Sequence, residues 1–212
     1  MKIAHQGWAF ILLGGAVAAA GALGLRAWGA ASYGIIGVGV FFSAFCGYFF
    51  RDPARELPQD FSKIYSPGDG TVLSVSQEEA QGPTVRIFLS IFDVHIQRLP
   101  STGEVTKVEY KPGSFAAAMK DEAKGNERSI VDIKVDGRNA VISVEQIAGL
   151  IARRIRTWVR EGDRAVMGER YGLIQFGSQA AVHFPKCARP SVKPGDKVIG
   201  GVTPIGEWIA AE

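Results

Sequence analysis

A glycine followed by a serine, Gly177 and Ser178, interrupts an otherwise apolar run from Leu173 to Pro185. Two interpretations of this pair are open. In the first, the glycine forms a bulge in a buried strand. In the second, the glycine leaves its carbonyl carbon unshielded, and the serine hydroxyl attacks it to form an ester. Elimination from that ester gives dehydroalanine, which hydrolyses to a pyruvoyl group at a new N-terminus, an electrophilic ketone that no encoded side chain supplies.

A serine that attacks its own backbone needs a base, and the chain has three histidines. His95 lies in a run from Phe88 to Pro100 that is too apolar for a surface loop. A neutral imidazole can take the serine proton near neutral pH, although a hydrogen-bonded core histidine is the alternative. His5 is expected only to flank the N-terminal apolar segment. His183 is expected to face away from Ser178 and to be structural.

A carboxylate is expected beside the imidazole, because it fixes the tautomer and supports the cation. Asp69 lies between Gly68 and Gly70, which is typical of an Asp-Gly turn or of a carboxylate delivered into a site. Asp93 precedes His95 by two residues, so that an extended strand places both on one face. Both aspartates are candidates.

Three arginines, Arg153, Arg154 and Arg156, are candidates to bind a phosphodiester. The alternative is the solvated or headgroup-facing edge of a strand. Their segment, Ile147 to Val159, has no clean period, and we expect a strand because its flanks are strands.

Short β-rich runs separated by glycine turns follow from Ile64 onward. The segment from Ser114 to Lys124 instead favours a helix or an ordered loop. The chain is therefore expected to be mainly β within the α+β class. The predicted strands are Thr71 to Val75, Thr84 to Leu89, Val105 to Tyr110, Ile130 to Val135 and Ala140 to Gln146.

An internal repeat relates the segment from Val159 to Gly168 with the later segment from Val192 to Gly201. Each copy carries Gly-Asp at an expected tight turn and a glycine five residues after the aspartate. Such turns are typical of a compact β-sandwich or barrel-sandwich domain of the lipoyl or biotinyl type. The Gly-Ser pair lies between the two copies, where sheet is expected on both sides of it.

Two uncharged runs, Trp8 to Leu25 and Ala27 to Phe50, precede the β-rich part. At about 1.5 Å per helical residue each approaches the roughly 30 Å of a bilayer core, which predicts a hydrophobic helical hairpin. Lys2, Arg51 and Arg55 lie outside the pair, which places both ends on the cytoplasmic side. A signal peptide and a shallow amphipathic anchor are the alternatives.

The predicted domains are an anchor over residues 1–50, a proline-containing linker over 51–63 and a catalytic β-rich domain over 64–212. The formal net charge of +3 comes without a basic and aromatic stripe, so that no nucleic-acid partner is expected and an anionic membrane surface fits better. Two distant cysteines, Cys46 and Cys187, form no metal spacing and no disulfide framework. No metal site is expected.

Several segments together resemble one family, the pyruvoyl-dependent phosphatidylserine decarboxylases in their short bacterial and archaeal form. They run in order from about residue 49 to the end, and jointly they are specific. The segments are Phe49 to Pro53, Ser66 to Gly70, Phe92 to Pro100, Gly113 to Phe115 with Asn126 to Arg128, Gln146 to Arg154, and Gly168 to Gly172 leading to Phe176, Gly177 and Ser178.

The resemblance implies a proenzyme that cleaves itself between Gly177 and Ser178. A β chain, residues 1–177, would keep the membrane segment, and an α chain, residues 178–212, would carry the pyruvoyl group made from Ser178. Asp69 matches the aspartate of the family's Asp-His-Ser processing triad, and His95 matches the histidine of its Asp-x-His segment. Longer members have a second histidine where this chain has Arg98, so that His95 is expected to serve both processing and decarboxylation.

The implied reaction converts phosphatidylserine to phosphatidylethanolamine through a Schiff base with the pyruvoyl ketone, as a step of phospholipid biosynthesis. His95 is the expected proton donor, and the catalytic domain is expected on the cytoplasmic face of the cell membrane. A homodimer stays an open alternative. A lipoyl-type binding module would need a lysine at a hairpin tip, which neither repeat has, and a serine hydrolase would need a helix-elbow glycine pattern, which is absent around Ser178.

Overall fold

The computed structural model describes residues 2–78, 82–114, 125–149, 154–175 and 178–209. The chain divides into two compact units, Met1–Ala54 and Arg55–Glu212. Residues 55–63, which sequence analysis assigned to the linker, belong to the second unit.

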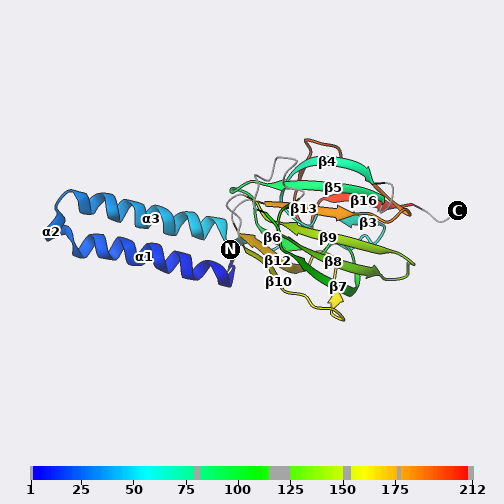
Figure 1. The fold of residues 1–212 in the computed structure, drawn as a ribbon, viewed down its shortest axis with the longest axis horizontal. Coiled ribbons are helices and arrows are strands. Elements are labelled where there is room, and N and C mark those ends of the chain that lie inside the picture. Colours follow the sequence, from blue (N-terminus) through cyan, green and yellow to red (C-terminus); the bar gives the residue numbers. More distant parts are fainter. Residues whose placement is uncertain (1, 79–81, 115–124, 150–153, 176–177, 210–212) are drawn as a thin grey trace. The chain divides into compact units, whose positions relative to one another are not determined.

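The first unit is the predicted helical hairpin (Figure 1). A short pair of antiparallel strands joins the residues before the first helix to the residues after the last one. Its elements are β1 (Lys2–Ile3), η1 (His5–Gly7), α1 (Trp8–Leu23), α2 (Leu25–Trp28), α3 (Ala31–Phe49) and β2 (Arg51–Asp52).

Glycines allow α1 and α3 to approach closely. A Cβ atom on Gly39 would lie 2.5 Å from the backbone nitrogen of Ala18, and one on Gly14 would lie 2.8 Å from the carbonyl oxygen of Gly39. The Ser43 hydroxyl also crosses between the helices and donates a hydrogen bond of 2.8 Å to the carbonyl of Ile11. Small residues and a shared polar contact are the features that join helices in a lipid environment.

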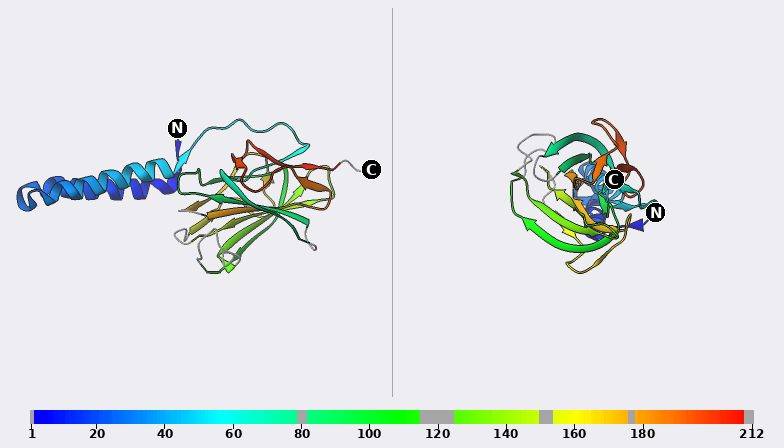
Figure 2. Two further views of the ribbon diagram at one scale, coloured as in Figure 1. Left: turned by 90° about the horizontal axis from the view of Figure 1, so that it is seen from above. Right: turned by 90° about the vertical axis from the view of Figure 1, so that its right-hand side faces the viewer.

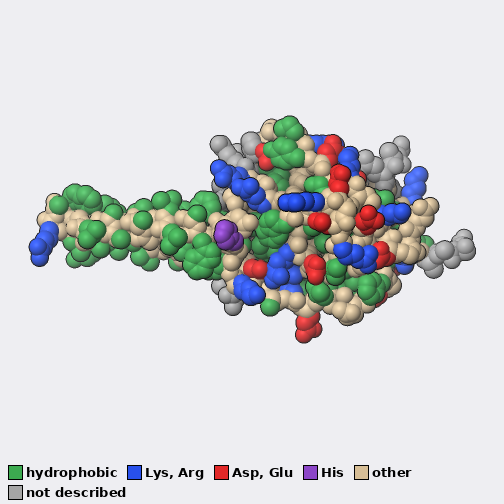
Figure 3. Space-filling view, turned by 90° about the horizontal axis from the view of Figure 1, so that it is seen from below, with side chains coloured by type: hydrophobic (Ala, Val, Ile, Leu, Met, Phe, Trp, Pro, Cys, Tyr) green, Lys and Arg blue, Asp and Glu red, His purple; other side chains and the backbone are tan. Residues whose placement is uncertain are grey.

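Two segments of 19 residues, His5–Leu23 and Ala31–Phe49, are long and apolar enough to cross a membrane, each with a mean hydropathy of 1.5. Hydrophobic side chains cover the visible face of the hairpin in Figure 3. Because most of these side chains are not buried within the hairpin, the two helices are compatible with membrane association.

The second unit is built from strands that curl into a barrel-like sandwich, as the end-on view in Figure 2 shows. This confirms the predicted mainly β fold. Its strands are β3 (Lys63–Tyr65), β4 (Gly70–Glu78), β5 (Gly82–Leu89), β6 (Ile96–Arg98), β7 (Gly103–Lys111), β8 (Arg128–Val135), β9 (Val141–Ile147), β10 (Arg154–Thr157), β11 (Arg164–Ala165), β12 (Arg170–Gln175), β13 (Ser178–His183), β14 (Ala188–Pro190), β15 (Lys197–Val198) and β16 (Pro204–Trp208).

The described strands of this unit form two matching halves. The large sheet has the order β11-β7-β8-β9-β13-β5-β4-β15, which is symmetric about the β9 and β13 pair. The two small sheets, β10-β12-β6 and β14-β16-β3, correspond strand for strand. Strand β3 precedes β6 in the chain, and β4 precedes β7, by the same number of residues that separates the two copies of the sequence repeat.

Hydrogen bonds at the two Gly-Asp turns repeat in the same way. Gly162 donates its N–H to the Val105 carbonyl over 2.8 Å, and Gly195 donates to the Val72 carbonyl over 2.9 Å. The Asp163 carboxylate accepts the N–H three residues before it, as the Asp196 carboxylate does. Both glycines have positive φ, at 87° and 95°, which explains why glycine occupies each turn.

One half is inserted into the other. Strands β6 to β12 are continuous in sequence and interrupt the second half between β5 and β13. In the inserted half, β8 turns directly into β9, and the Val135 N–H bonds the Ala140 carbonyl over 3.0 Å. In the interrupted half, the corresponding partners are Leu89 and Ser178. Ser178 therefore occupies the position of Ala140, at the point where the chain returns from the inserted half.

The prediction of one strand over Ile147 to Val159 is wrong in part. Strand β9 ends at Ile147, β10 begins at Arg154 in a different sheet, and Ala148 and Gly149 lie in neither strand. The change of sheet explains the lack of a clean period in this segment. Residues 150–153 lie outside the described residues, as does 115–124, where a helix or an ordered loop was expected.

A buried polar cluster lies on the outer face of the large sheet. His183 Nε2 lies 3.2 Å from the Glu145 carboxylate, and His183 Nδ1 lies 2.9 Å from the Thr84 hydroxyl. Burial alone would raise the pKa of Glu145, but the hydrogen bond to His183 and the charges of His183, Arg128 and Arg86 together hold that pKa below its ordinary value. This cluster holds β13 against β5 and β9 from the outside.

We expect the Glu145→Gln protein to be less stable than the parent at pH 7, by about 1 to 3 kcal/mol, because it loses a buried charged hydrogen bond. A lowered folded-state pKa contributes stability above the unfolded-state value of about 4.3 and loses it as the pH falls. The stability difference should therefore shrink below about pH 4. Urea unfolding of the full chain in detergent at both pH values measures it, with Glu104→Gln on exposed β7 as the control. A difference that grows on acidification would contradict the assignment.

Candidate functional site

Ser178 is the first residue of β13, a central strand that is hydrogen-bonded to β5 on one side and to β9 on the other. The serine is fully buried. Its side chain shares a face with those of Ala180 and Val182, which belong to the hydrophobic core. The hydroxyl therefore points into the interior of the sandwich. Gly177, the other half of the pair, lies outside the described residues.

A first set of contacts links Ser178 to Gln97. Ser178 lies opposite Leu89 in the ladder, so that their side chains are neighbours on one face. A Cβ atom built on Gly68 would lie 3.2 Å from Leu89 Cδ2 and 3.0 Å from Gln97 Nε2. Gly68 thus provides the space in which the Gln97 amide and the Leu89 side chain meet.

A second set of contacts returns from Gln97 to Ser178. Gln97 pairs with Gly172 between β6 and β12, and a Cβ atom on Gly172 would lie 2.6 Å from Gln146 Nε2. Gln146 lies opposite Ala180, which is two residues from Ser178 on the same face. These neighbours form a closed circuit of interior positions, here called the Ser178 ring: Gly68, Leu89, Ser178, Ala180, Gln146, Gly172 and Gln97.

The Ser178 ring holds buried polar atoms that have no hydrogen-bond partner within the described part of the chain. They are the Ser178 hydroxyl, both amide atoms of Gln97 and the amide nitrogen of Gln146. The carbonyl oxygen of Gln146 instead accepts a hydrogen bond of 2.9 Å from the Thr157 hydroxyl. Buried polar groups are nearly always paired, so that several unpaired ones around one hydroxyl indicate a site for a reacting group or ligand.

Sequence reasoning missed both glutamines. Gln97 follows His95 by two residues, and Gln146 lies within the segment that carries the resemblance, but a glutamine in a strand is ordinarily expected to face solvent. Gln97 pairs with Gly172 in the strand register, and Gln146 lies over the same glycine from the other sheet, which only the structure shows.

His95 is fully buried, and its Nδ1 lies 2.9 Å from the backbone carbonyl oxygen of Asp93. A carbonyl only accepts hydrogen bonds, so that Nδ1 carries the proton and, in the neutral ring, Nε2 carries the lone pair. The Asp93 carboxylate instead accepts the Ser90 N–H over 2.8 Å. Asp93 therefore orients the imidazole through its backbone, whereas the sequence had suggested a side-chain contact.

Asp69 is held by two other groups. One carboxylate oxygen accepts a hydrogen bond of 2.8 Å from Arg55 Nη2, and the other accepts the Gly200 N–H over 2.9 Å. Arg55 also donates to the Gly200 carbonyl. Both side chains of the ion pair are mostly buried, at 8% and 16% exposed. The described partners of the Asp69 carboxylate are thus Arg55 and Gly200, and a shared role of Asp69 and His95 in processing stays a prediction.

The matching half shows what a structural residue at the Asp69 position needs to do. By the spacing of the repeat, Thr102 is the equivalent of Asp69, and Met167 is the equivalent of Gly200. The Thr102 hydroxyl accepts the N–H of Met167 over 3.1 Å. A neutral hydroxyl is thus enough to accept this N–H. The carboxylate of Asp69 and its arginine partner go beyond that requirement, which favours a chemical role for Asp69.

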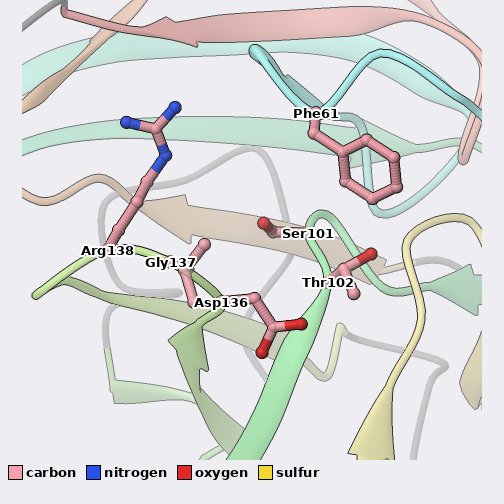
Figure 4. Close-up of a pocket in the computed structure, with 7 residues that line it drawn as sticks. Phe61, Ser101, Thr102, Asp136, Gly137 and Arg138 are labelled. Carbon is pink, nitrogen blue, oxygen red and sulfur yellow. The ribbon is translucent and has the colours of Figure 1, made fainter.

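A cavity of about 260 Å³ lies beside Thr102 and the turn that joins β8 to β9 (Figure 4). Its charged side chains are engaged elsewhere, because Asp136 pairs with Arg164 and the Arg138 guanidinium lies 4.5 Å from the Trp208 ring centre. This place corresponds to the Ser178 end of the other half, but it lacks the unpaired glutamine amides.

The remaining candidates fall into two groups. Arg98 is buried, and its Nη1 donates a hydrogen bond of 2.8 Å to the Gly168 carbonyl. Arg154 and Arg156 are exposed on β10, an edge strand, and Arg154 lies opposite Gln175, three residues before Ser178. They could therefore bind an anion outside the Ser178 ring but not within it. Arg153 lies outside the described residues.

Comparisons with known proteins assign a family. A family model described as phosphatidylserine decarboxylase matches residues 42–206. The phosphatidylserine decarboxylase proenzyme of Symbiobacterium thermophilum is 43% identical over 211 residues, which cover 96% of this chain and 94% of that protein. The proenzyme of Gluconobacter oxydans is 45% identical over 180 residues, with 80% and 79% covered, and that of Paraburkholderia xenovorans is 40% identical over 213 residues, with 97% and 96% covered. These matches confirm the resemblance that the sequence segments indicated.

We expect Asp69→Asn to destabilise the fold by about 3 kcal/mol, because it leaves Arg55 as a buried, unpaired charge while the amide oxygen can still accept the Gly200 N–H. Arg55→Met should cost a similar amount, and the double variant less than the sum. Urea unfolding of the four proteins gives the coupling energy. The exposed pair Arg164 and Asp136 is the control, with an expected coupling below about 1 kcal/mol. Equal coupling in the two pairs would contradict a buried interaction.

Proposed function

We propose that this chain, which belongs to the phosphatidylserine decarboxylase family, is a membrane-attached proenzyme that cleaves itself between Gly177 and Ser178. Members of the family are decarboxylases, and the substrate named by the family is phosphatidylserine. The observation that carries the proposal is the buried hydroxyl of Ser178, which starts a central strand and has no hydrogen-bond partner among the described residues. A hydroxyl that served only the fold would have a hydrogen-bond partner there.

The proposed cleavage begins when Ser178 Oγ bonds to the carbonyl carbon of Gly177 and the peptide C–N bond breaks, giving an ester and a free amine. Removal of the Ser178 Cα proton then expels the Gly177 carboxylate from Cβ and leaves dehydroalanine. Its imine tautomer takes up water and releases ammonia, which leaves a pyruvoyl group on Gln179. No outside oxidant or reductant is needed, and the products are a β chain ending at Gly177 and an α chain starting at position 178.

His95 is proposed to move the protons in these steps. Support comes from its tautomer, because the bond from Nδ1 to the Asp93 carbonyl leaves the Nε2 lone pair as the base. The connection from β5 to β6 contains His95, and the last residue of β5 lies opposite Ser178. The residue and the reacting strand therefore belong to the same end of the sandwich. Asp69 is proposed as the acidic member of the processing group, held in place by Arg55.

The pyruvoyl group supplies a ketone that takes the substrate amine and accepts the electron pair released when carbon dioxide leaves. The burial of position 178 limits the access of bulk water to this centre. His95 would then return a proton to the substrate carbon. Arg154 and Arg156, exposed on β10, and Arg153 beside them in sequence are proposed to bind the phosphodiester.

The helical hairpin is proposed to hold the enzyme in the cell membrane, with the β-rich unit on the cytoplasmic side. Its two apolar segments of 19 residues support this placement. A substrate that is itself a membrane lipid makes such attachment useful, because the site then stays at the surface where the lipid is concentrated. Both chains would remain parts of one β unit after cleavage.

The Ser178→Ala protein should remain a single uncut chain and produce no phosphatidylethanolamine, because it lacks the only proposed nucleophile. Mass spectrometry of the parent should show two chains, with the α chain beginning in a pyruvoyl group. Ser191→Ala, at an exposed serine in the α chain, is the control and should be cut and active. Decarboxylation by uncut Ser178→Ala protein would rule the proposal out.

Membrane attachment should depend on the apolar surface of the hairpin. Leu13 and Val38 are exposed, at 56% and 66%, and arginine at both positions should release the protein from membranes into alkaline carbonate extracts. Each charge costs about 2.5 to 3.5 kcal/mol at the centre of a membrane helix. Ile199→Arg, at an exposed position of the β unit, should stay with the membrane fraction. Retention of the double variant would argue against spanning helices.

A further inference from the structure

Gln97 is the most anomalous buried side chain among those described. It is fully buried, and neither its amide nitrogen nor its amide oxygen has a hydrogen-bond partner in the described residues. Methionine or leucine would fill the same volume without this cost, so that the fold alone gives no reason for an amide at this position. A buried polar group of this kind is explained when something else binds it.

The Ser178 ring connects the Gln97 amide to the reacting position through the Leu89 side chain. Gln97 contacts the space over Gly68 that it shares with Leu89, and Leu89 lies opposite Ser178. On its other side Gln97 is the cross-strand neighbour of Gly172, where the Gln146 amide lies. The amide and the Ser178 side chain are therefore both buried in the interior of the sandwich, with Leu89 a neighbour of each.

The chemistry of an amide matches that of an amino-acid headgroup. A glutamine side chain offers two N–H donors and one carbonyl acceptor. The serine headgroup of the substrate offers a carboxylate, which only accepts, and an amine, which donates. We propose that Gln97 is a specificity-determining residue that binds the carboxylate of the serine headgroup through Nε2 and meets the amine through Oε1. This inference rests on the proposed function, because it places the headgroup at position 178.

A neutral donor suits a carboxylate that must leave as carbon dioxide. A lysine or arginine would stabilise the negative carboxylate in the bound substrate more than in the transition state, where that charge is moving away. Arg98 follows Gln97 directly, but its guanidinium is directed to the Gly168 carbonyl, and Arg55 is paired with Asp69. The amide can thus orient the carboxylate while opposing its loss less than a full charge would.

The product lacks the group that Gln97 binds. Phosphatidylethanolamine has the amine and the phosphodiester but no carboxylate, so that the contact to Nε2 exists before the reaction and not after it. Gln97 should therefore contribute to the selection of substrate over product, because the product keeps only the amine contact to Oε1.

Gln97→Met tests the proposal, because it keeps the volume and removes both polar atoms. We expect the variant to be cut completely between Gly177 and Ser178 and to unfold at a higher temperature than the parent. Its kcat/KM for phosphatidylserine in mixed micelles should fall about 10- to 100-fold, as for the loss of a hydrogen bond to a charged group. Inhibition by phosphatidylethanolamine, which can make only the amine contact to Oε1, should weaken by a smaller factor than kcat/KM falls. The kcat/KM of Gln97→Glu should be lower still, because the added carboxylate repels that of the substrate.

Tyr171→Phe is the matched control. The Tyr171 hydroxyl is also buried without a hydrogen-bond partner in the described residues, but its ring belongs to the hydrophobic core and not to the Ser178 ring. This variant should be cut and should keep its kcat/KM. An equal loss of activity in Tyr171→Phe would overturn the specific role of Gln97.

Three further results would show whether the Gln97 proposal or the proposed function itself fails. Parent-like kcat/KM in Gln97→Met overturns the proposal. Loss of thermal stability together with loss of cleavage also overturns it, because both show a structural role. If the parent protein itself shows no cleavage and no pyruvoyl group, the proposed function fails, and that outcome is visible before any Gln97 variant is made.

Discussion

The hydrogen bonding of β13 on both sides is the constraint on which the rest of the structure depends. A strand paired with β5 and β9 cannot shift its register by one residue without turning every interior side chain outward. The register therefore fixes the Ser178 hydroxyl on the interior face. The outer cluster of His183, Glu145 and Thr84 holds the same strand from its other face. The candidate site is thus a property of the sheet as a whole.

The two matching halves share one scaffold but differ at the end where Ser178 lies. Both halves use the same Gly-Asp turns and the same strand order. In the inserted half, a short turn that ends at Ala140 joins β8 directly to β9. In the other half, the chain is interrupted after β5 and resumes at Ser178. The halves differ again where Thr102 has a neutral hydroxyl and Asp69 has a carboxylate paired with Arg55. Ser178 and Asp69 both belong to the half whose chain is interrupted, whereas Gln97 and Gln146 belong to the inserted half.

Much of the fold could be predicted from the sequence, because its signals are local. The apolar helices, the five β-rich runs and the Gly-Asp repeat all depend on neighbouring residues, and the structure has each of them. The family also followed from ordered segments. The symmetry of the sheets could not be predicted from the sequence, because the sequence repeat is visible only at turns where glycine is required.

The candidate site was only partly accessible to sequence reasoning. Ser178 and His95 stood out by residue type, and both are fully buried, while their chemical roles stay predictions. The contact from His95 to the Asp93 backbone, the partners of Asp69 and the amides of Gln97 and Gln146 depend on strand pairing between distant segments. Side-chain contacts of that kind leave no spacing in the sequence.

The insertion of one half into the other has a consequence for the timing of maturation. Strand β13 can pair with both neighbours only after the whole inserted half has been synthesised and β5 and β9 have formed. The peptide bond before Ser178 would therefore become reactive only in a finished molecule. A chain that misfolds would stay intact and inert, so that the break in the backbone would be a permanent record of correct assembly.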